Sequence, residues 1–232
     1  MSAADGRVQE LFTQLGITID PQLYRLALTH RSWAFEHGGA PHNERLEFLG
    51  DAVLGVVVTE HLYRSFPDKP EGWLAKMRAA VVNTYALADV ARGLALGQVL
   101  LLGKGERQTG GADKDSILAD ATEAMIAAVF LSCGREAASR FVHALMDPVV
   151  EAASTDGRAT DWKTALQELA AHLGLTSPHY VHTASGPDHN RRFEARAVVG
   201  GDTFAPFVAR SKKLAEQGAA ELAHRQLASQ HP

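Results

Sequence analysis

The stretch from Asn43 to Leu54, Asn-Glu-Arg-Leu-Glu-Phe-Leu-Gly-Asp-Ala-Val-Leu, decides how the first part of this chain is interpreted. At about 100° per residue, helical spacing places its acidic residues on one stripe. These are Glu44, Glu47 and Asp51. The opposite, core-facing side carries Leu46, Leu49 and Val53. Like charges three or four residues apart destabilise a helix by about 0.2–0.5 kcal/mol per pair, and Arg45 points about a quarter-turn away. We therefore expect a positive charge from outside this helix to neutralise the stripe.

The composition is that of an ordinary globular protein, with 46% hydrophobic and 22% charged residues in a chain of 232. No apolar run reaches about 18 residues, and the N-terminus lacks the pattern of a secretory signal. We therefore expect a cytoplasmic protein without a membrane partner. The single cysteine, Cys133, excludes an internal disulfide, and no second cysteine is available for a thiolate metal site.

Charge is distributed unevenly along the chain, which carries a net charge of -4. Residues 161–232 contain eight Lys or Arg against seven Asp or Glu, so the preceding residues hold 15 basic and 20 acidic side chains. An acidic first part and a mildly basic second part indicate two modules with different tasks. The overall negative charge therefore does not exclude a nucleic-acid partner for the second part.

The first module is predicted to be all-α. Apolar residues recur at helical spacing in six segments, separated by Gly, Pro and Asp: 8–15, 22–28, 43–63, 73–94, 117–130 and 136–150. Residues 151–160 are small and polar without a hydrophobic period, which is typical of a linker. We therefore expect a first domain at residues 1–150 and a second at residues 161–232.

A polar, glycine-rich segment, residues 103–114, precedes the helix expected from Ile117. It lacks the preceding strand and the spacing of a phosphate-binding P-loop. Two interpretations stay open, an exposed connector and a loop that contacts substrate.

The second module has a different order of elements. The pattern predicts a helix, three strands and a helix at residues 162–173, 179–183, 192–199, 203–209 and 211–228. This α-β-β-β-α order indicates a small α+β domain, with both helices packed on one face of a three-stranded sheet.

A second acidic pair, Asp120 and Glu123, lies on a helix that is otherwise apolar from Ile117 to Phe130. A buried carboxylate pair requires a cation or hydrogen-bond partners. Two helices that each present such a pair would form an oxygen-only cluster suited to Mg²⁺, whereas no His or Cys lies at ligand spacing beside these acids, which disfavours zinc there. A Mg²⁺ cluster favours phosphoryl chemistry, in which the metal activates water and stabilises the attacking and leaving oxygens. Taken alone, each pair is also compatible with a solvated helix face.

Four segments resemble the ribonuclease III family. Residues 43–54 are similar to its signature motif, and residues 118–124, Leu-Ala-Asp-Ala-Thr-Glu-Ala, are similar to its second acidic motif. Residues 28–32, Leu-Thr-His-Arg-Ser, and residues 103–111 resemble further family segments in the expected order. The resemblance extends over the whole chain and implies the bacterial type, with one endonuclease domain and one double-stranded RNA-binding domain.

The resemblance implies roles for the acidic residues of the first module. It makes metal ligands of Glu47, Asp51, Asp120 and Glu123. Asp51 and Glu123 are the implied catalytic residues that matter most for hydrolysis, with Glu123 holding metal directly. Glu44 and Glu71 match accessory acidic positions near the cleavage site, and surface charge is the alternative for both.

Phe48 lies beside the acidic stripe on a helical wheel and not with the core-facing residues. The resemblance implies that it inserts into the partner subunit of a homodimer, where the two acidic clusters flank one cleft. Packing within its own subunit is the alternative.

The last helix is expected to carry Lys212 and Lys213 in its first turn, where the helix dipole disfavours cations. A phosphate bound at the helix N-terminus reverses that sign, so Ser211, Lys212 and Lys213 are predicted to clamp an RNA backbone. Solvated lysines are the alternative.

Residues 163–168, 186–193 and 211–220 resemble a double-stranded RNA-binding domain in the family order. Such domains recognise the shape of A-form RNA over about 16 base pairs. The residues implied to enter minor grooves are Thr164, Gln167, Glu168 and His189. Two departures stand out. Residues 207–210, directly before Ser211, lack a glycine that the family often has there, and Gly218 replaces a helix-favouring alanine at a cost of about 1 kcal/mol.

Together these patterns predict a homodimeric endoribonuclease that uses Mg²⁺, with Mn²⁺ as a substitute, to hydrolyse both strands of double-stranded RNA. The resemblance implies 5′-phosphate products with short 3′ overhangs and, as substrates, ribosomal RNA precursors and structured messages. A noncatalytic RNA-binding protein is disfavoured because all four motif positions are acidic. A nucleotide phosphohydrolase on another helical fold would leave the second module unexplained.

Overall fold

The computed structural model describes residues 3–155, 162–186 and 191–231. The chain divides into two compact units, residues 1–159 and 160–232. Each unit has its own hydrophobic core.

The regular secondary structure in the described part of the first unit is helical, apart from an isolated bridge between Thr29 and Leu101. Its α-helices are α1 (Ala3–Leu15), α2 (Pro21–Ala27), α3 (Arg31–Glu36), α4 (Glu44–Ser65), α5 (Glu71–Val81), α6 (Thr84–Gly93), α7 (Lys104–Gln108) and α8 (Asp115–Thr155). Two short 3-10 helices, η1 (Leu96–Gln98) and η2 (Gly111–Asp113), lie among them. The all-α prediction for this module is confirmed.

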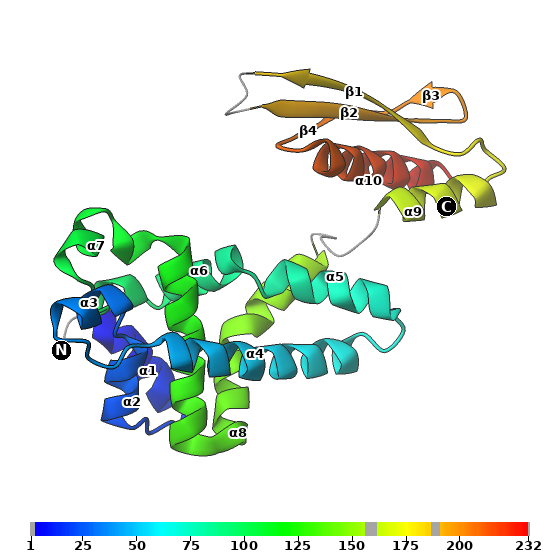
Figure 1. The fold of residues 1–232 in the computed structure, drawn as a ribbon. Helices are drawn as coiled ribbons and strands as arrows, with labels where there is room; N and C mark the ends of the chain where they lie inside the picture. Colours follow the sequence, from blue (N-terminus) through cyan, green and yellow to red (C-terminus); the bar gives the residue numbers. More distant parts are fainter. Residues whose placement is uncertain (1–2, 156–161, 187–190, 232) are drawn as a thin grey trace. The chain divides into compact units, whose positions relative to one another are not determined.

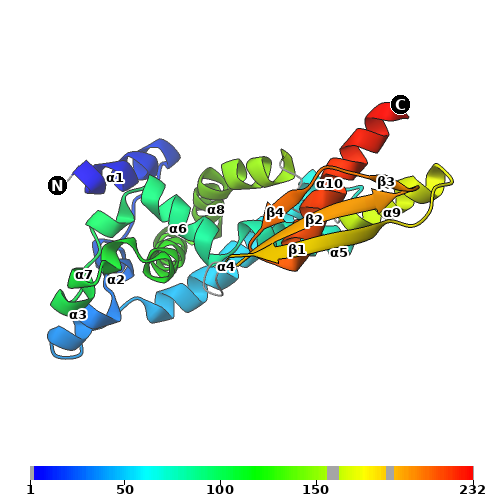
Figure 2. The ribbon, with the colours of Figure 1, turned by 90° about the horizontal axis from the view of Figure 1, so that it is seen from above.

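Helix α8 forms the centre of the first unit, with α4 and α6 packed beside it (Figures 1 and 2). From Ile117 to Val129 every side chain of α8 is buried except those of Asp120 and Glu123, which are half-buried. Helix α4 turns one apolar stripe toward α8, made of Leu46, Gly50, Leu54, Val57, Val58 and Leu62. Leu49 and Val53 flank this stripe and are partly buried. The charged and apolar faces predicted for α4 are therefore present.

Gly134 interrupts α8 with a backbone φ of 80°. This kink separates two helical segments, as the sequence pattern predicted. The second segment continues through Thr155, so the first five residues of the expected linker are helical. The remainder of that linker falls on residues 156–160, which lie outside the described residues.

By length and composition, α8 is the one helix among the described residues that could cross a membrane. However, 61% of its most apolar window is buried against other helices, as in the core helix of a globular protein. Its hydropathy is explained by its central position.

The predicted helix 73–94 is wrong as a single element. The structure has α5 and α6 there, separated at Val82 and Asn83. The Asn83 side chain accepts hydrogen bonds from the backbone N–H groups of Tyr85 and Ala86 and caps α6. Helices α3 and α7, of six and five residues, are too short for their periodicity to be recognised in the sequence.

The second unit has helices α9 (Trp162–His172) and α10 (Lys212–Gln230) on one face of an antiparallel sheet (Figure 1). Its strands are β1 (His179–Ser185), β2 (Arg192–Val199), β3 (Asp202–Thr203) and β4 (Phe207–Ala209). Both β1 and the pair β3 and β4 bond to β2, on opposite edges. The predicted third strand, 203–209, is therefore split. Pro206, which lacks a backbone N–H, lies in the gap.

Gly218 of α10 lies under the ring of Phe207 from β4. A Cβ at this position would overlap the ring. The glycine that departs from the family pattern is thus required by the neighbouring phenylalanine, and its low helix propensity is offset by close packing between α10 and the sheet.

Candidate metal centre and RNA-binding surface

Helices α4 and α8 are in close backbone contact where their carboxylates lie. A Cβ on Gly50 would overlap the backbone carbonyl of Glu123, so only glycine allows this crossing. Gly50 lies between Glu47 and Asp51 on α4, and the contact therefore brings both acidic pairs to one place. The sequence pattern did not single out Gly50, because its importance depends on a helix far away in the chain.

Three carboxylates, Glu47, Asp120 and Glu123, each offer an oxygen within 4.8 Å of the others. All three are half-buried. Asp51 is more exposed and falls outside this group, but its charge raises the pKa values of Glu47 and Glu123. The structure thus gathers three of the four predicted metal ligands tightly and puts the fourth beside them. A cluster of oxygen donors without His or Cys suits a hard divalent cation.

The cluster resists ionisation when no cation is bound. Burial, and then the charges of Asp51, Asp120 and Glu47, raise the pKa of Glu123 to about 7. Burial first and then Asp120 raise the pKa of Glu47, and burial raises the pKa of Asp120. Each shift has the sign expected for carboxylates that are partly buried beside other carboxylates.

The expected positive charge from outside α4 is Arg31, at the start of α3. Its guanidinium lies 3.5 Å from the Glu44 carboxylate and also acts against the rise in the pKa of Asp120. Arg31 neutralises only the outer end of the acidic stripe, since both side chains of this ion pair are largely exposed. The sequence contained a signal for it, the segment Leu28–Ser32 that resembles the family.

The second unit presents its predicted RNA-binding residues on two helices. Thr164, Gln167 and Glu168 are exposed on one face of α9, opposite the buried Leu166 and Ala170. His189 lies outside the described residues.

Ser211 caps α10, because its hydroxyl accepts a hydrogen bond from the backbone N–H of Leu214 at 3.3 Å. Lys212 and Lys213 follow in the first turn and are exposed. No acidic residue lies in that turn, so its positive charge is available to an anion.

Comparison with known proteins agrees with this geometry. A family model described as Ribonuclease-III-like matches residues 20–149, and one described as Double-stranded RNA binding motif matches residues 162–227. Ribonuclease 3 of Streptomyces coelicolor is 58% identical over 214 residues, covering 92% of this chain and 78% of that protein. The chain belongs to the ribonuclease III family.

Two further relatives support the assignment. Ribonuclease 3 of Thermobifida fusca is 56% identical over 93% of this chain and 90% of its own length. The solved nuclease domain of ribonuclease III from Campylobacter jejuni matches 61% of this chain and 96% of its own, with a TM-score of 0.56 and 41% identity. As a ribonuclease III with both modules, the protein is an endoribonuclease of double-stranded RNA, and its family implies a requirement for a divalent metal.

Of the two accessory acids predicted for this ribonuclease III, only Glu44 lies near the carboxylate cluster. Glu71 is the first residue of α5 and lines a pocket with Thr59, Tyr63 and Arg78, at the opposite end of α4 (Figure 1). At about 1.5 Å per residue, Tyr63 is about 24 Å along the helix from Glu47. Within one chain, Glu71 is therefore not brought to the cluster.

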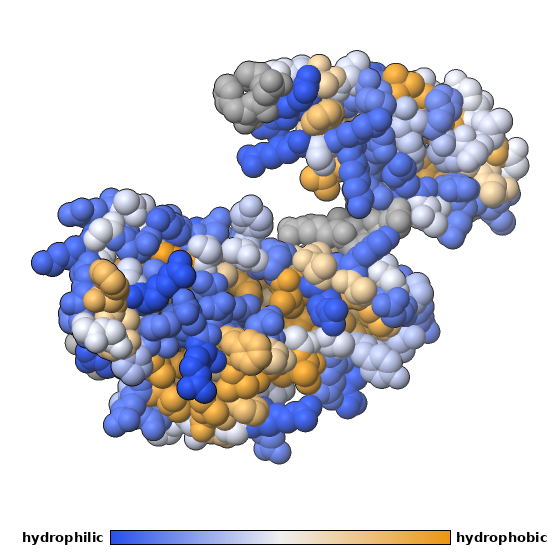
Figure 3. Space-filling view, viewed as in Figure 1, coloured by the Kyte–Doolittle hydropathy of each residue, from blue (hydrophilic) through white to orange (hydrophobic). Residues whose placement is uncertain are grey.

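Phe48 projects from α4 with 80% of its surface exposed. It begins an exposed apolar stripe along α4 that continues through Ala52, Val56 and Tyr63. In the space-filling view, hydrophobic side chains gather along and beside α4 (Figure 3). Packing of Phe48 within its own subunit, the alternative left open by the sequence, is thus not observed.

The glycine-rich segment of this ribonuclease III is more ordered than a plain connector. It forms α7 and η2, and it is tied to α3 because Ser32 Oγ accepts from Gly103 N–H and Glu36 Oε1 accepts from Lys104 N–H, at 2.9 and 2.8 Å. Lys114 closes it with an ion pair to Glu106 at 2.6 Å. Contact with substrate stays a prediction for this segment.

Proposed function

We propose that Glu47, Asp51, Asp120 and Glu123 form the catalytic metal centre of this endoribonuclease and that the cation is Mg²⁺, which Mn²⁺ can replace. The observation that carries the proposal is the half-buried oxygen cluster, in which burial and neighbouring carboxylates raise the pKa of Glu123 to about 7. A bound divalent cation supplies an activated water and stabilises charge on the scissile phosphate. The four side chains bind and position that cation, and Glu123 and Asp51 are the residues on which hydrolysis depends most.

The raised pKa values support this assignment. Oxygens that resist ionisation in the free protein gain most from a cation, because the positive charge replaces the missing counter-ion. Cation binding has to displace the proton that Glu123 holds up to about pH 7. We therefore expect the affinity for metal to fall as the pH drops below about 7.

The functional unit is proposed to be a homodimer formed through the exposed stripe of α4. A groove lined by Ala52, Gly55, Val56, Thr59, Glu60, Tyr63 and Arg78 lies further along the same helix as Phe48. If two copies of α4 pair antiparallel about a two-fold axis, Phe48 of each faces the groove of the other. The Campylobacter jejuni nuclease domain is described as having a region involved in dimer formation.

The same pairing gives Glu71 a role that one chain does not offer. Glu71 lies beside the groove, at the end of α4 that an antiparallel partner's carboxylate cluster would approach. We propose that it acts as an accessory acid near the partner's cleavage site, while Glu44 acts beside the cluster of its own chain.

The second unit is proposed to bind double-stranded RNA by recognising the shape of the RNA duplex. Thr164, Gln167 and Glu168 of α9, together with His189, would contact minor grooves, while Lys212 and Lys213 at the start of α10 hold the phosphates between them. The two modules would be residues 1–150 and 161–232, joined by a linker. We further propose products with 5′-phosphates and short 3′ overhangs, ribosomal RNA precursors and structured messages as substrates, and a cytoplasmic location.

The deciding experiment incubates a long RNA duplex and each of its single strands with the protein, with and without Mg²⁺. We expect cleavage of the duplex only, and only with the cation. Glu123→Gln should reduce the rate by at least about 100-fold while duplex binding stays within about twofold, since the variant keeps the RNA-binding unit. Glu151→Gln, an exposed acid on α8, is the matched control and should cleave normally. Cleavage by Glu123→Gln at the wild-type rate would refute the metal centre.

A further inference from the structure

A second group of potential metal ligands lies in the first unit, away from the carboxylate cluster. His61 of α4 and His143 and Asp147 of the second segment of α8 each offer a donor atom within 4.8 Å of the others. His61 is 14 residues beyond Glu47 on α4, which corresponds to about 21 Å along the helix. The two groups are therefore distinct sites.

One carboxylate oxygen, Asp147 Oδ1, faces both imidazoles. It lies 2.9 Å from His143 Nδ1 and 3.8 Å from His61 Nε2. The first distance fits a hydrogen bond, whereas the second is too long for one. Within the part of the chain that the structure describes, Asp147 has no Lys or Arg as an ion-pair partner. Hydrogen bonding alone thus leaves His61 without a good contact in this group.

The spacing fits a bound cation better. Ligands at about 2.0–2.2 Å from a tetrahedral zinc lie about 3.3 Å from one another. The two measured distances fall on either side of that value, so small side-chain rotations would bring the three donors into place. The two rings already meet edge to face, with centroids 5.1 Å apart.

The three ligands lie beside buried residues of the core. Each ligand follows or precedes a fully buried residue: Leu62 beside His61, Val142 beside His143 and Met146 beside Asp147. The ligands themselves are half-buried, with 24%, 38% and 47% of the side chains of His61, His143 and Asp147 exposed. A cation can therefore enter from solvent, and water can fill its fourth position.

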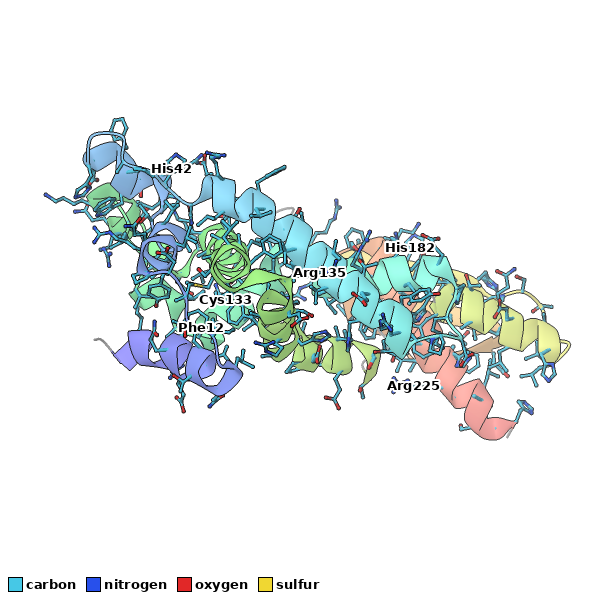
Figure 4. The ribbon with its side chains drawn as sticks, turned by 90° about the horizontal axis from the view of Figure 1, so that it is seen from below. Phe12, His42, Cys133, Arg135, His182 and Arg225 are labelled. Carbon is cyan, nitrogen blue, oxygen red and sulfur yellow. The ribbon has the colours of Figure 1, made fainter. Side chains whose placement is uncertain are left out.

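Two arginines near His61 are paired with a carboxylate. Glu60, the neighbour of His61, pairs with Arg64 at 2.8 Å and with Arg135 at 3.8 Å, so both arginines are engaged by a carboxylate. Figure 4 labels Arg135 on α8, beside α4. Two imidazole nitrogens and one carboxylate oxygen form a mixed donor set that suits Zn²⁺ and disfavours Mg²⁺.

We infer that His61, His143 and Asp147 form a zinc site, separate from the catalytic centre, that joins α4 to the second segment of α8. The bound ion stabilises the nuclease domain and takes no part in RNA cleavage. The function of the carboxylate cluster is not needed for this inference.

The test uses full-length, tag-free protein carrying Glu47→Gln and Glu123→Gln, so that the carboxylate cluster does not compete for zinc. Titration calorimetry with Zn²⁺ should give one ion per chain. At zinc concentrations 100-fold above the dissociation constant, the melting temperature should rise by about 5–10 °C. Cobalt in place of zinc should show visible absorption bands of a four-coordinate site.

Adding His143→Ala to this background should weaken zinc binding by more than about 100-fold and abolish the thermal shift, because even outer-shell partners of a metal contribute about 10–100-fold. Adding His182→Ala, an exposed histidine of the second unit (Figure 4), is the control and should change neither value. If His143→Ala alters the metal-free melting temperature, Asp147→Asn is used in place of His143→Ala, because asparagine keeps the volume of the aspartate side chain. Absence of zinc binding in the parent, or binding that survives both substitutions, would overturn the inference.

Discussion

At the scale of single residues, the carboxyl group of Glu123 links the fold to the chemistry. Its pKa rises from the ordinary 4.5 to about 7, first because of burial and then because of Asp51, Asp120 and Glu47. The metal-free protein therefore contains a group whose ionised form is more stable in the unfolded chain. A site that binds a cation strongly is, for the same reason, a source of instability without one.

The pH dependence of stability tests this residue. Between about pH 4.5 and 7 the folded chain keeps the Glu123 proton while the unfolded chain releases it. The free energy of unfolding of the metal-free protein should thus fall as the pH rises through this window, and the loss should be complete above it. In EDTA, thermal melts of the wild type and of Glu123→Gln should diverge from about pH 4.5 to 7, with the variant more stable at pH 8. If the melting temperatures of the two proteins keep a constant difference across this pH range, Glu123 ionises as freely in the folded protein as in the unfolded chain.

At the scale of elements, two glycines set the packing. Gly50 allows α4 to contact the backbone of α8 at Glu123, and Gly218 allows α10 to pass under Phe207. Neither has a positive φ, so both are required for the space they leave and not for backbone conformation. In each pair, an added methyl group would push two elements apart.

Gly50→Ala should destabilise the protein by about 1–3 kcal/mol or more, because a Cβ would overlap backbone that has no room to move. The same shift separates Glu47 from Glu123, so the affinity for Mg²⁺ and the cleavage rate should fall as well. The matched control is Gly93→Ala at the end of α6, where a Cβ meets nothing within 4 Å and alanine should stabilise by up to about 1 kcal/mol. Chemical denaturation and duplex cleavage measure both effects, and equal stability of the two variants would contradict the account.

Gly218→Ala should destabilise the second unit by about 1–3 kcal/mol, although alanine favours helix. Removing the Phe207 ring should reverse the effect of Gly218→Ala on the free energy of unfolding. In a Phe207→Ala background, Gly218→Ala should stabilise the second unit by about 0.5–1 kcal/mol. A double-mutant cycle in thermal unfolding measures this coupling. Additive effects of the two substitutions would mean that Phe207 does not determine the need for glycine.

At the scale of the whole molecule, the described parts leave two surfaces without partners in the chain itself. One is the apolar stripe of α4, where Phe48, Val56 and Tyr63 are 80%, 54% and 72% exposed. The other is the first turn of α10, with Lys212 and Lys213 and no acidic residue. The first suits a second copy of the chain and the second suits a phosphate backbone.

Phe48→Ala should raise the dissociation constant of the homodimer by about 30-fold or more, as expected for a central aromatic anchor. Analytical ultracentrifugation over a range of protein concentrations measures it. Phe35→Ala is the control, because Phe35 is 87% exposed on α3 and lies off the stripe. A dimer that is unaffected by Phe48→Ala but weakened by Phe35→Ala would place the interface elsewhere.

Replacing Lys212 and Lys213 by Ala should weaken duplex binding and flatten its salt dependence. The slope of the logarithm of the binding constant against the logarithm of the salt concentration should fall by about one for each phosphate that is no longer neutralised. Arg196→Ala offers a comparison on β2, where the guanidinium already pairs with Glu194 on the sheet surface. Its slope should stay at the wild-type value. If the variant without both lysines also keeps the wild-type slope, Lys212 and Lys213 do not contact the phosphates and the prediction is wrong.

The sequence by itself determined the features that depend on near neighbours. Helical periodicity predicted the acidic stripe of Glu44, Glu47 and Asp51 and the second acidic pair, Asp120 and Glu123, on an apolar helix. The change of pattern after residue 161 predicted the α-β-β-β-α order of the second module. Two predictions were wrong because a weak local signal stood within a stronger pattern. Apolar residues continue across Asn83, so the helix cap at that residue was not recognised and α5 and α6 were predicted as one helix. Aromatic and β-branched residues flank Pro206, so β3 and β4 were predicted as one strand.

Only the tertiary structure decided how these parts meet. It brought Glu47 to Glu123 through the contact at Gly50, explained Gly218 by Phe207, placed Glu71 at the far end of α4 and joined His61 to His143 and Asp147. Each of these facts depends on how two or more elements pack against one another. Side-chain periodicity specifies which face of a helix is buried but not where two helices cross, and that crossing point depends on the packing of the whole core.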